Sequence, residues 1–154
     1  MATLGDAFSP DVRRASITRQ LQPGAVIKLC ERMDDGNEQE KRFVVLSVTA
    51  ITVCFVVNSE MNEYVQQREH LARNHVLMPQ ADHGFMTHDS YVDCAQLKSY
   101  STAHVISELM DKADWVLGTI NLDLRDRIVA TLNLSSTIPL FERVPLCQAL
   151  ATMT

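Results

Sequence analysis

The chain has 154 residues and a mass of 17.3 kDa, a size at which one folded domain is expected. Apolar residues make up 46% of the sequence and charged residues 21%, which is typical of a protein with a buried core and excludes a disordered chain. Nineteen acidic residues against fourteen Lys and Arg give a net charge of −5. Because a protein that binds nucleic acid over its whole surface is usually basic, any phosphate-binding role has to rest on a local patch.

The sequence also bears on where such a protein would reside. Its longest strongly apolar stretch, Phe43 to Val57, is shorter than the roughly 20 residues that cross a bilayer. The first residues lack the basic-then-apolar order of a secretory leader. The four cysteines are widely spaced and form no Cys-x-x-Cys pair for zinc or redox chemistry. We therefore expect a cytoplasmic protein with no membrane segment and no cofactor.

The first predicted element is a helix at Ser9–Leu21. Its opening Ser-Pro-Asp suits an N-cap, a proline in the first turn and an acid near the helix N-terminus. The apolar positions make only a weak stripe, so we expect a peripheral helix or arm that ends at Pro23-Gly24. The helix would carry three cations, namely Arg13, Arg14 and Arg19.

A strand-rich zone follows. A polar loop at Met33–Glu40 separates the first two predicted strands, and a polar segment at 62–74 follows the third. Several short strands at close spacing predict a small barrel. The predicted strands are Ala25–Cys30, Arg42–Ser47, Ile51–Val57, His75–Met78 and Tyr91–Cys94.

The last zone has helical periodicity. Ser101 or Thr102 can cap one helix, which we expect Gly118 to end, and Asn121 can cap another. The fold class is therefore α+β, mainly β, with helices towards the C-terminus. We divide the chain into an N-terminal helix or arm at 1–22, a main domain at 23–139 and a short apolar tail at 140–154.

Two positions in the strand zone can carry phosphate chemistry. Lys41 and Arg42 stand where the polar loop enters a buried strand, and a guanidinium there can stabilise an anionic phosphorane. The alternative is a surface charge at a strand start. Asn58 and Ser59 end the next strand, where an amide or hydroxyl can touch a substrate oxygen. Turn formation explains both residues equally well.

A third candidate is the segment Asp82–Cys94, which holds two histidines, carboxylates and a thiol. These are common metal ligands, but His83 and His88 lack a helical ligand spacing, so we predict no metal site. A turn held by Asp89 and Ser90 is one alternative. Another is that His88 acts as a general acid or base.

Taken in order, these pieces resemble the PemK/MazF-like growth-inhibitor toxins of bacterial toxin–antitoxin pairs. The matching segments are Pro23-Gly-Ala-Val-Ile-Lys28, the loop Met33–Glu40, Lys41-Arg-Phe-Val-Val-Leu-Ser47, Val53-Cys-Phe-Val-Val-Asn-Ser59, Met86-Thr-His-Asp-Ser-Tyr-Val92 and Gly118. The sequence departs from the family pattern in placing Phe43 where a proline is usual and Glu60 where a second hydroxyl residue is common.

The resemblance implies a small SH3-like barrel that forms a homodimer and cleaves single-stranded RNA without a metal or other cofactor, until an antitoxin protein blocks it. Arg42 would stabilise the transition state, with Ser59 at the scissile phosphate and His88 as a third catalytic group. Lys41, Asn58 and Ser90 would bind the substrate. The alternative is an inactive barrel that serves as a protein- or nucleic-acid-binding module.

Overall fold

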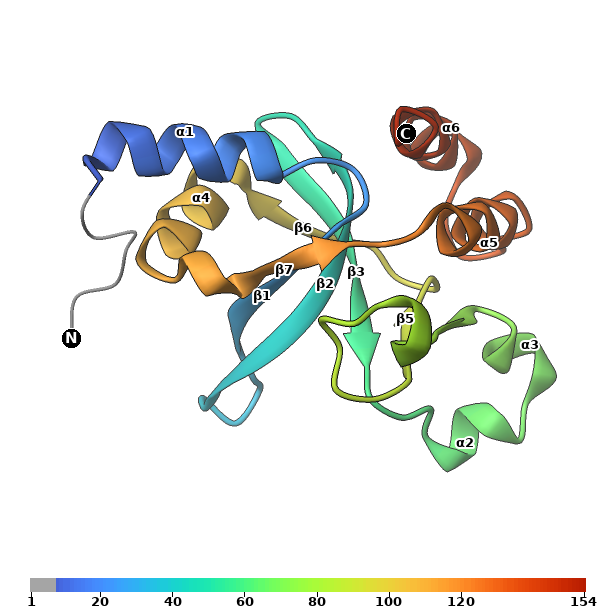
Figure 1. Ribbon diagram of the computed structural model, residues 1–154. Coiled ribbons are helices and arrows are strands. Elements are labelled where there is room, and N and C mark those ends of the chain that lie inside the picture. The colour runs from blue at the N-terminus through green and yellow to red at the C-terminus, as the bar shows by residue number, and fades with distance from the viewer. Residues whose placement is uncertain (1–7) are drawn as a thin grey trace.

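The computed structural model describes residues 8–154 (Figure 1). Its fold is α+β and strand-rich, and the antiparallel sheet curls into a half-barrel with helices at the C-terminal end, which confirms the predicted fold class at this level. The elements in chain order are α1 (Pro10–Gln20), β1 (Ala25–Arg32), β2 (Glu38–Val48), β3 (Ile51–Asn58), α2 (Glu63–Gln66), α3 (Glu69–Ala72), β4 (His75–Met78), the short 3₁₀ helix η2 (Gln80–Asp82), β5 (Ser90–Asp93), β6 (Lys98–Ser101), α4 (Thr102–Asp111), a second 3₁₀ helix η3 (Ala113–Trp115), β7 (Val116–Thr119), α5 (Leu122–Asn133) and α6 (Leu140–Leu150).

One sheet of seven strands organises the molecule. The strand order is β4-β5-β3-β2-β1-β7, and β6 pairs with the other end of β3. All the pairings are antiparallel. All five predicted strands are present, with β1 and β2 longer than expected, because the polar loop between them is a tight turn around Gly36, whose φ is +84°. Only glycine adopts this conformation without steric cost.

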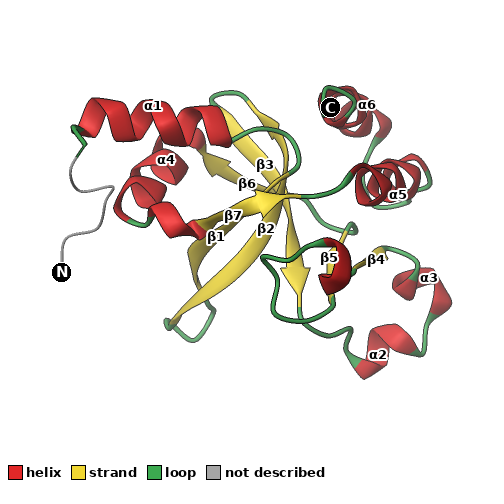
Figure 2. Cartoon of the chain, in the orientation of Figure 1, coloured by secondary structure: helices red, strands yellow, loops and turns green. Residues whose placement is uncertain are grey.

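The sheet carries a hydrophobic cluster on each face, and separate helices cover the two faces (Figure 2). Successive side chains of a strand point to opposite faces, so Val44 and Leu46 join one cluster while Phe43 and Val45 join the other. Helices α5 and α6 cover the first face with Leu124, Ile128, Leu132, Leu146 and Leu150. Helices α1 and α4 cover the second with Ile17, Val105, Ile106 and Leu109.

The helix expected at the N-terminus is present as α1. Ser9 accepts the backbone N–H of Val12 through its hydroxyl, and Pro10 occupies the first helical position, as the sequence predicts. Of its residues only Ile17 is buried, because the helix lacks a continuous apolar stripe. α1 therefore lies on the surface of the second cluster, against α4.

Gly118 does not end a helix. α4 ends at Asp111, and Gly118 lies in β7, which pairs with β1. The glycine is needed for packing against another segment. A Cβ at Gly118 would collide with the ring of Phe85, so only a glycine lets that ring lie against the strand. Asn121 does cap α5, accepting the N–H of Leu124 at 2.8 Å, as predicted.

Residues 140–154 are not a tail. The first eleven of them, Leu140–Leu150, form α6, which places Leu146 and Leu150 in the first cluster. The polar segment at 62–74 contains the one-turn helices α2 and α3, neither of which buries a residue. Within residues 8–154, no helix combines the length and apolar character needed to pass through a bilayer.

Candidate functional site

Arg42 lies in the middle of the sheet, on the face that α5 and α6 cover. It is paired with Lys28 of β1 and Val57 of β3. Directly paired residues share a face of the sheet. Since Val57 belongs to the cluster under α5 and α6 and is paired in turn with Val92 of β5, this row of residues points to one side. Arg42 therefore lies on the face of β2 on which the apolar side chains of Val44 and Leu46 are buried.

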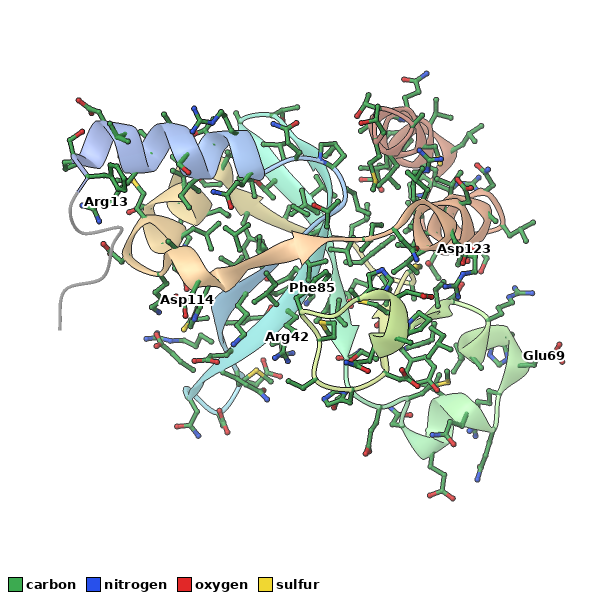
Figure 3. All side chains as sticks on the ribbon, viewed as in Figure 1. Arg13, Arg42, Glu69, Phe85, Asp114 and Asp123 are labelled. Atoms are coloured by element: carbon green, nitrogen blue, oxygen red, sulfur yellow. The ribbon has the colours of Figure 1, made fainter. Side chains whose placement is uncertain are left out.

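The guanidinium of Arg42 is not held by the protein. Its Nε is buried and has no hydrogen-bond partner among the described residues, and none of the ion pairs found within residues 8–154 includes Arg42. A buried donor without a partner costs free energy. Figure 3 shows Arg42 on β2 and Phe85 on the segment between η2 and β5. Because Nε itself is buried, an anionic partner would have to reach the terminal nitrogens of this half-buried side chain.

Lys41 points to the opposite face. Its Nζ lies 3.3 Å from a carboxylate oxygen of Glu31, and Lys98 and the hydroxyl of Tyr100 approach the other oxygen at 3.7 and 3.2 Å. Burial alone would raise the pKa of Glu31, but the hydrogen bond and charge of Lys41, helped by Lys98 and Tyr100, lower it. Lys41 is thus part of a structural ion-pair cluster that the structure does not bring together with Arg42.

The two predicted residues at the end of β3 are separated by the same alternation. Asn58 is half-buried and paired with Tyr91, on the face that carries Lys41. Ser59 comes directly after the strand and is exposed. Asn58 is paired with Tyr91 in an antiparallel register, so the residue after Asn58 and the residue before Tyr91 lie at the same end of β3 and β5. These residues are Ser59 and Ser90.

His88 and Ser90 form the one direct contact among the predicted site residues in the described chain. The Nδ1 of His88 lies 2.8 Å from the carbonyl oxygen of Asp89 and 3.3 Å from the hydroxyl of Ser90. A carbonyl can only accept, so Nδ1 carries the proton in the neutral ring. Nε2 is then the unprotonated nitrogen of an exposed side chain. It is free to accept a proton from a substrate.

The strand register sets the distance between these groups. Ser90 is two residues from Val92, which lies two strands from Arg42 in the same row. With about 4.8 Å between strands and about 3.4 Å of rise per residue, the Cα atoms of Arg42 and Ser90 are roughly 12 Å apart. Ser90 is 1% exposed. In residues 8–154 no hydrogen bond joins Arg42 to Ser59, His88 or Ser90. A substrate would therefore have to bridge the space between Arg42 and the other three residues.

The neighbouring histidine, His83, has a structural position that the sequence did not reveal. It is 1% exposed, its Nδ1 lies 2.9 Å from the carbonyl oxygen of Pro79, and its Nε2 accepts the backbone N–H of Asn121 at 3.1 Å. No group of three or more His, Cys, Asp or Glu side chains in residues 8–154 is arranged to hold a metal ion. His83 instead fixes the segment before β5 to the start of α5.

Carboxylates surround the same end of the sheet. Glu40, Glu60 and Asp89 are all exposed. Asp89 has a structural partner, because its Oδ1 accepts the backbone N–H of Gln80 at 2.9 Å. Glu40 approaches Lys28 at 3.9 Å. The field around Arg42 is therefore mixed in sign and not uniformly positive.

No known family model, curated protein or solved structure matches this chain. The resemblance to the PemK/MazF-like toxins therefore remains a hypothesis that rests on the order of the short motifs alone.

Proposed function

We propose that this protein is a metal-independent endoribonuclease that acts on single-stranded RNA, in the manner of the PemK/MazF-like toxins. The observation that carries the proposal is Arg42, whose buried Nε has no partner in the described chain, on the sheet face that also bears Ser90. A permanently charged guanidinium with free donors suits a phosphate oxygen better than water or an apolar side chain does.

The arrangement supplies the groups that such a cleavage needs. The 2′-hydroxyl of the RNA gives its proton to Nε2 of His88 while its oxygen forms a bond to phosphorus. The bond from phosphorus to the 5′-oxygen then breaks, and the leaving oxygen takes a proton from solvent. Arg42 stabilises the charge that collects on the phosphorane oxygens. The products are a 2′,3′-cyclic phosphate and a 5′-hydroxyl.

Ser59 and Ser90 have different parts in this proposal. Ser59 is exposed at the end of β3 and donates to a non-bridging oxygen of the scissile phosphate. Ser90 is buried and contacts His88 at 3.3 Å, so it orients the imidazole. Single-stranded RNA suits this surface because its backbone can bend towards groups that belong to different strands.

The proposal includes two protein partners. Strands β4 and β7 end the sheet in the described chain, and an edge strand offers backbone groups for pairing with another copy or with an extended peptide. We propose that the protein forms a homodimer and that an antitoxin peptide binds at the half-buried Arg42. A mass measurement by light scattering at micromolar concentration tests the first of these, since a monomer contradicts it.

A second candidate function is a binding module that retains the fold without the chemistry. The exposed carboxylates Glu40 and Glu60 favour it, because they repel a phosphate near Arg42. Such a module would bind its ligand through the same face and leave RNA intact.

The deciding experiment incubates the full chain with single-stranded RNA in excess EDTA. Arg42→Gln keeps much of the side-chain volume and removes the charge, and His88→Gln removes the base. Arg14→Gln is the charge-matched control, because Arg14 is exposed on α1, a helix that packs against the other face of the sheet. We expect cleavage by the wild type and by Arg14→Gln, and at least a hundredfold loss in the other two. Intact RNA with the wild type overturns the proposal.

A further inference from the structure

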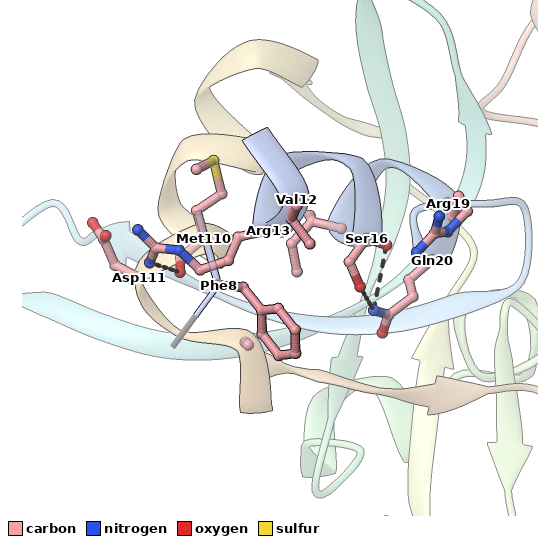
Figure 4. A pocket seen from close by; sticks show the side chains of 10 residues that line it. Phe8, Val12, Arg13, Ser16, Arg19, Gln20, Met110 and Asp111 are labelled. Atoms are coloured by element: carbon pink, nitrogen blue, oxygen red, sulfur yellow. Dashed lines mark hydrogen bonds between the residues drawn. The ribbon is translucent and has the colours of Figure 1, made fainter. Parts of the chain in front are cut away.

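A cavity of about 380 Å³ lies between α1 and the end of α4 (Figure 4). Its volume is in the range of pockets that hold small molecules. The cavity belongs to the helical layer on the face of the sheet opposite Arg42, because α1 and α4 pack on the second hydrophobic cluster. A ligand here is therefore independent of the proposed ribonuclease site.

The lining changes in character along α1. Figure 4 shows Arg13 and Asp111 at one end, Gln20 and Arg19 at the other, and Phe8 with Val12 between them. Further apolar surface comes from Ile17, Met110 and Ala113. The cavity thus has an apolar middle, with an arginine at each end.

Arg13 is only partly satisfied by the protein. One terminal nitrogen, Nη1, donates to the carbonyl oxygen of Met110 at 3.3 Å, at the end of α4. Nε is buried and has no hydrogen-bond partner in the described chain. Asp111 lines the same end, yet no ion pair joins it to Arg13 among the described residues. Because Nε itself is buried, an anion would have to bind the terminal nitrogens, of which only Nη1 donates to the protein within residues 8–154.

The polar residue at the centre of the cavity already accepts a hydrogen bond. The hydroxyl of Ser16 accepts from the side-chain amide of Gln20 at 3.1 Å, and the same amide also approaches the carbonyl of Ser16 at 3.3 Å. These contacts lie within α1 itself. The wall between the two arginines therefore offers both polar and apolar surface to a ligand.

We propose that this cavity binds an elongated amphipathic carboxylate, with its anionic group on Arg13 and its apolar body along Phe8, Val12 and Met110. The charge pattern favours an anion, because two arginines, Arg13 and Arg19, line the cavity against one acid, Asp111. The apolar part of the lining, from Phe8, Val12 and Met110, suits a hydrocarbon or aromatic body.

The test titrates decanoate, below its micellar concentration, into the full ¹⁵N-labelled chain and follows the amide signals of Val12, Ser16 and Ala113. Decanol has the same apolar body without the charge, and decyltrimethylammonium carries the opposite charge. We expect saturable shifts with decanoate, at least tenfold weaker binding of decanol, and no saturable binding of the cation.

Two variants locate the binding. Arg13→Gln should weaken decanoate binding by about tenfold to a hundredfold, whereas Arg14→Gln, with the same loss of charge one position away, should change it less than twofold. Val12 is 50% exposed, so Val12→Trp fills the cavity with little effect on the core and should abolish binding.

Several results overturn the proposal. They are the absence of saturable binding of decanoate, equal affinity for decanol, equal weakening by Arg13→Gln and Arg14→Gln, or decanoate binding that survives Val12→Trp. If Arg13→Gln loosens α1, a lower unfolding temperature shows it, and Val12→Trp then decides alone. Loss of RNA cleavage in Arg42→Gln without a change in decanoate binding separates this site from the ribonuclease site.

Discussion

His83 and Asn121 are joined across the molecule: the backbone N–H of Asn121, the residue that caps α5, donates to Nε2 of His83 at 3.1 Å. Because Nε2 accepts, the proton of the neutral ring is on Nδ1, which donates to the carbonyl of Pro79 at 2.9 Å. One buried imidazole therefore fixes the segment before β5, which carries His88, to the helix that covers the Arg42 face of the sheet.

Replacing His83 should destabilise the protein. His83→Leu leaves the N–H of Asn121 without its acceptor and removes one of the two donors to the carbonyl of Pro79, which also accepts the N–H of Asp82. The loss should lower the free energy of unfolding by about 1–3 kcal/mol. Urea denaturation measures this loss. His88→Leu, a change of the same kind at an exposed position, should cost less than about 1 kcal/mol. Equal losses in the two variants would contradict the assigned role of His83.

Gly118 should tolerate no side chain. An added Cβ would collide with the ring of Phe85, so Gly118→Ala should lower the free energy of unfolding by about 1–3 kcal/mol. The ring also stacks edge-on against His83, with centroids 5.8 Å apart, and it should shift when the strand is altered. Gly84→Ala is the matched control, because no atom lies within 4 Å of a Cβ at that position. Calorimetric unfolding temperatures compare the two.

Glu31 should make stability depend on pH. Its pKa is lowered in the folded protein, since Lys41, Lys98 and Tyr100 together outweigh the effect of burial. A lowered pKa stabilises the fold above the unfolded value of about 4.3 and loses that contribution as the pH falls through the folded value. Glu31→Gln should therefore be less stable than the wild type at pH 7. The difference between the two free energies of unfolding should shrink below pH 4.

The cysteines should differ in reactivity. Burial raises the pKa of Cys54 to about 12 and also raises the pKa of Cys94, so neither should react with a thiol reagent in the folded protein at pH 8. Cys30 lines a cleft between β1 and α4, with Nζ of Lys112 at 3.9 Å from its sulfur. Mass spectrometry after brief labelling should find Cys30 modified first. Faster labelling of Cys54 or Cys94 would contradict the packing of the sheet.

The sequence predicted the elements with strong local signals. Five strands and the caps at Ser9 and Asn121 follow from β-branched runs and from capping chemistry. β6 and β7 were missed because each depends on a distant partner strand and neither is a continuous apolar run: β6 is Lys-Ser-Tyr-Ser and β7 contains Gly118. Gly118 was misread because a glycine that admits a ring from another segment has the same local pattern as a glycine that ends a helix.

The candidate site was predictable in part. Lys41 and Arg42 are adjacent in a strand, so alternation alone places them on opposite faces, and the two cannot serve one groove. The contact between His88 and Ser90 follows from their spacing of two residues. The position of His83 depends on its hydrogen bond with the backbone N–H of Asn121, the residue that caps α5, 38 residues further along the chain. No local sequence pattern encodes a contact at that separation.

The most direct measurement of the proposed function identifies the ends of the RNA fragments and the rate at which they form in excess EDTA. Wild-type protein should leave 2′,3′-cyclic phosphate and 5′-hydroxyl ends, and Arg42→Gln should form them about 10²–10³ times more slowly, with a free energy of unfolding no lower than that of the wild type. Intact RNA, or equal rates for the two proteins, would contradict the role assigned to Arg42.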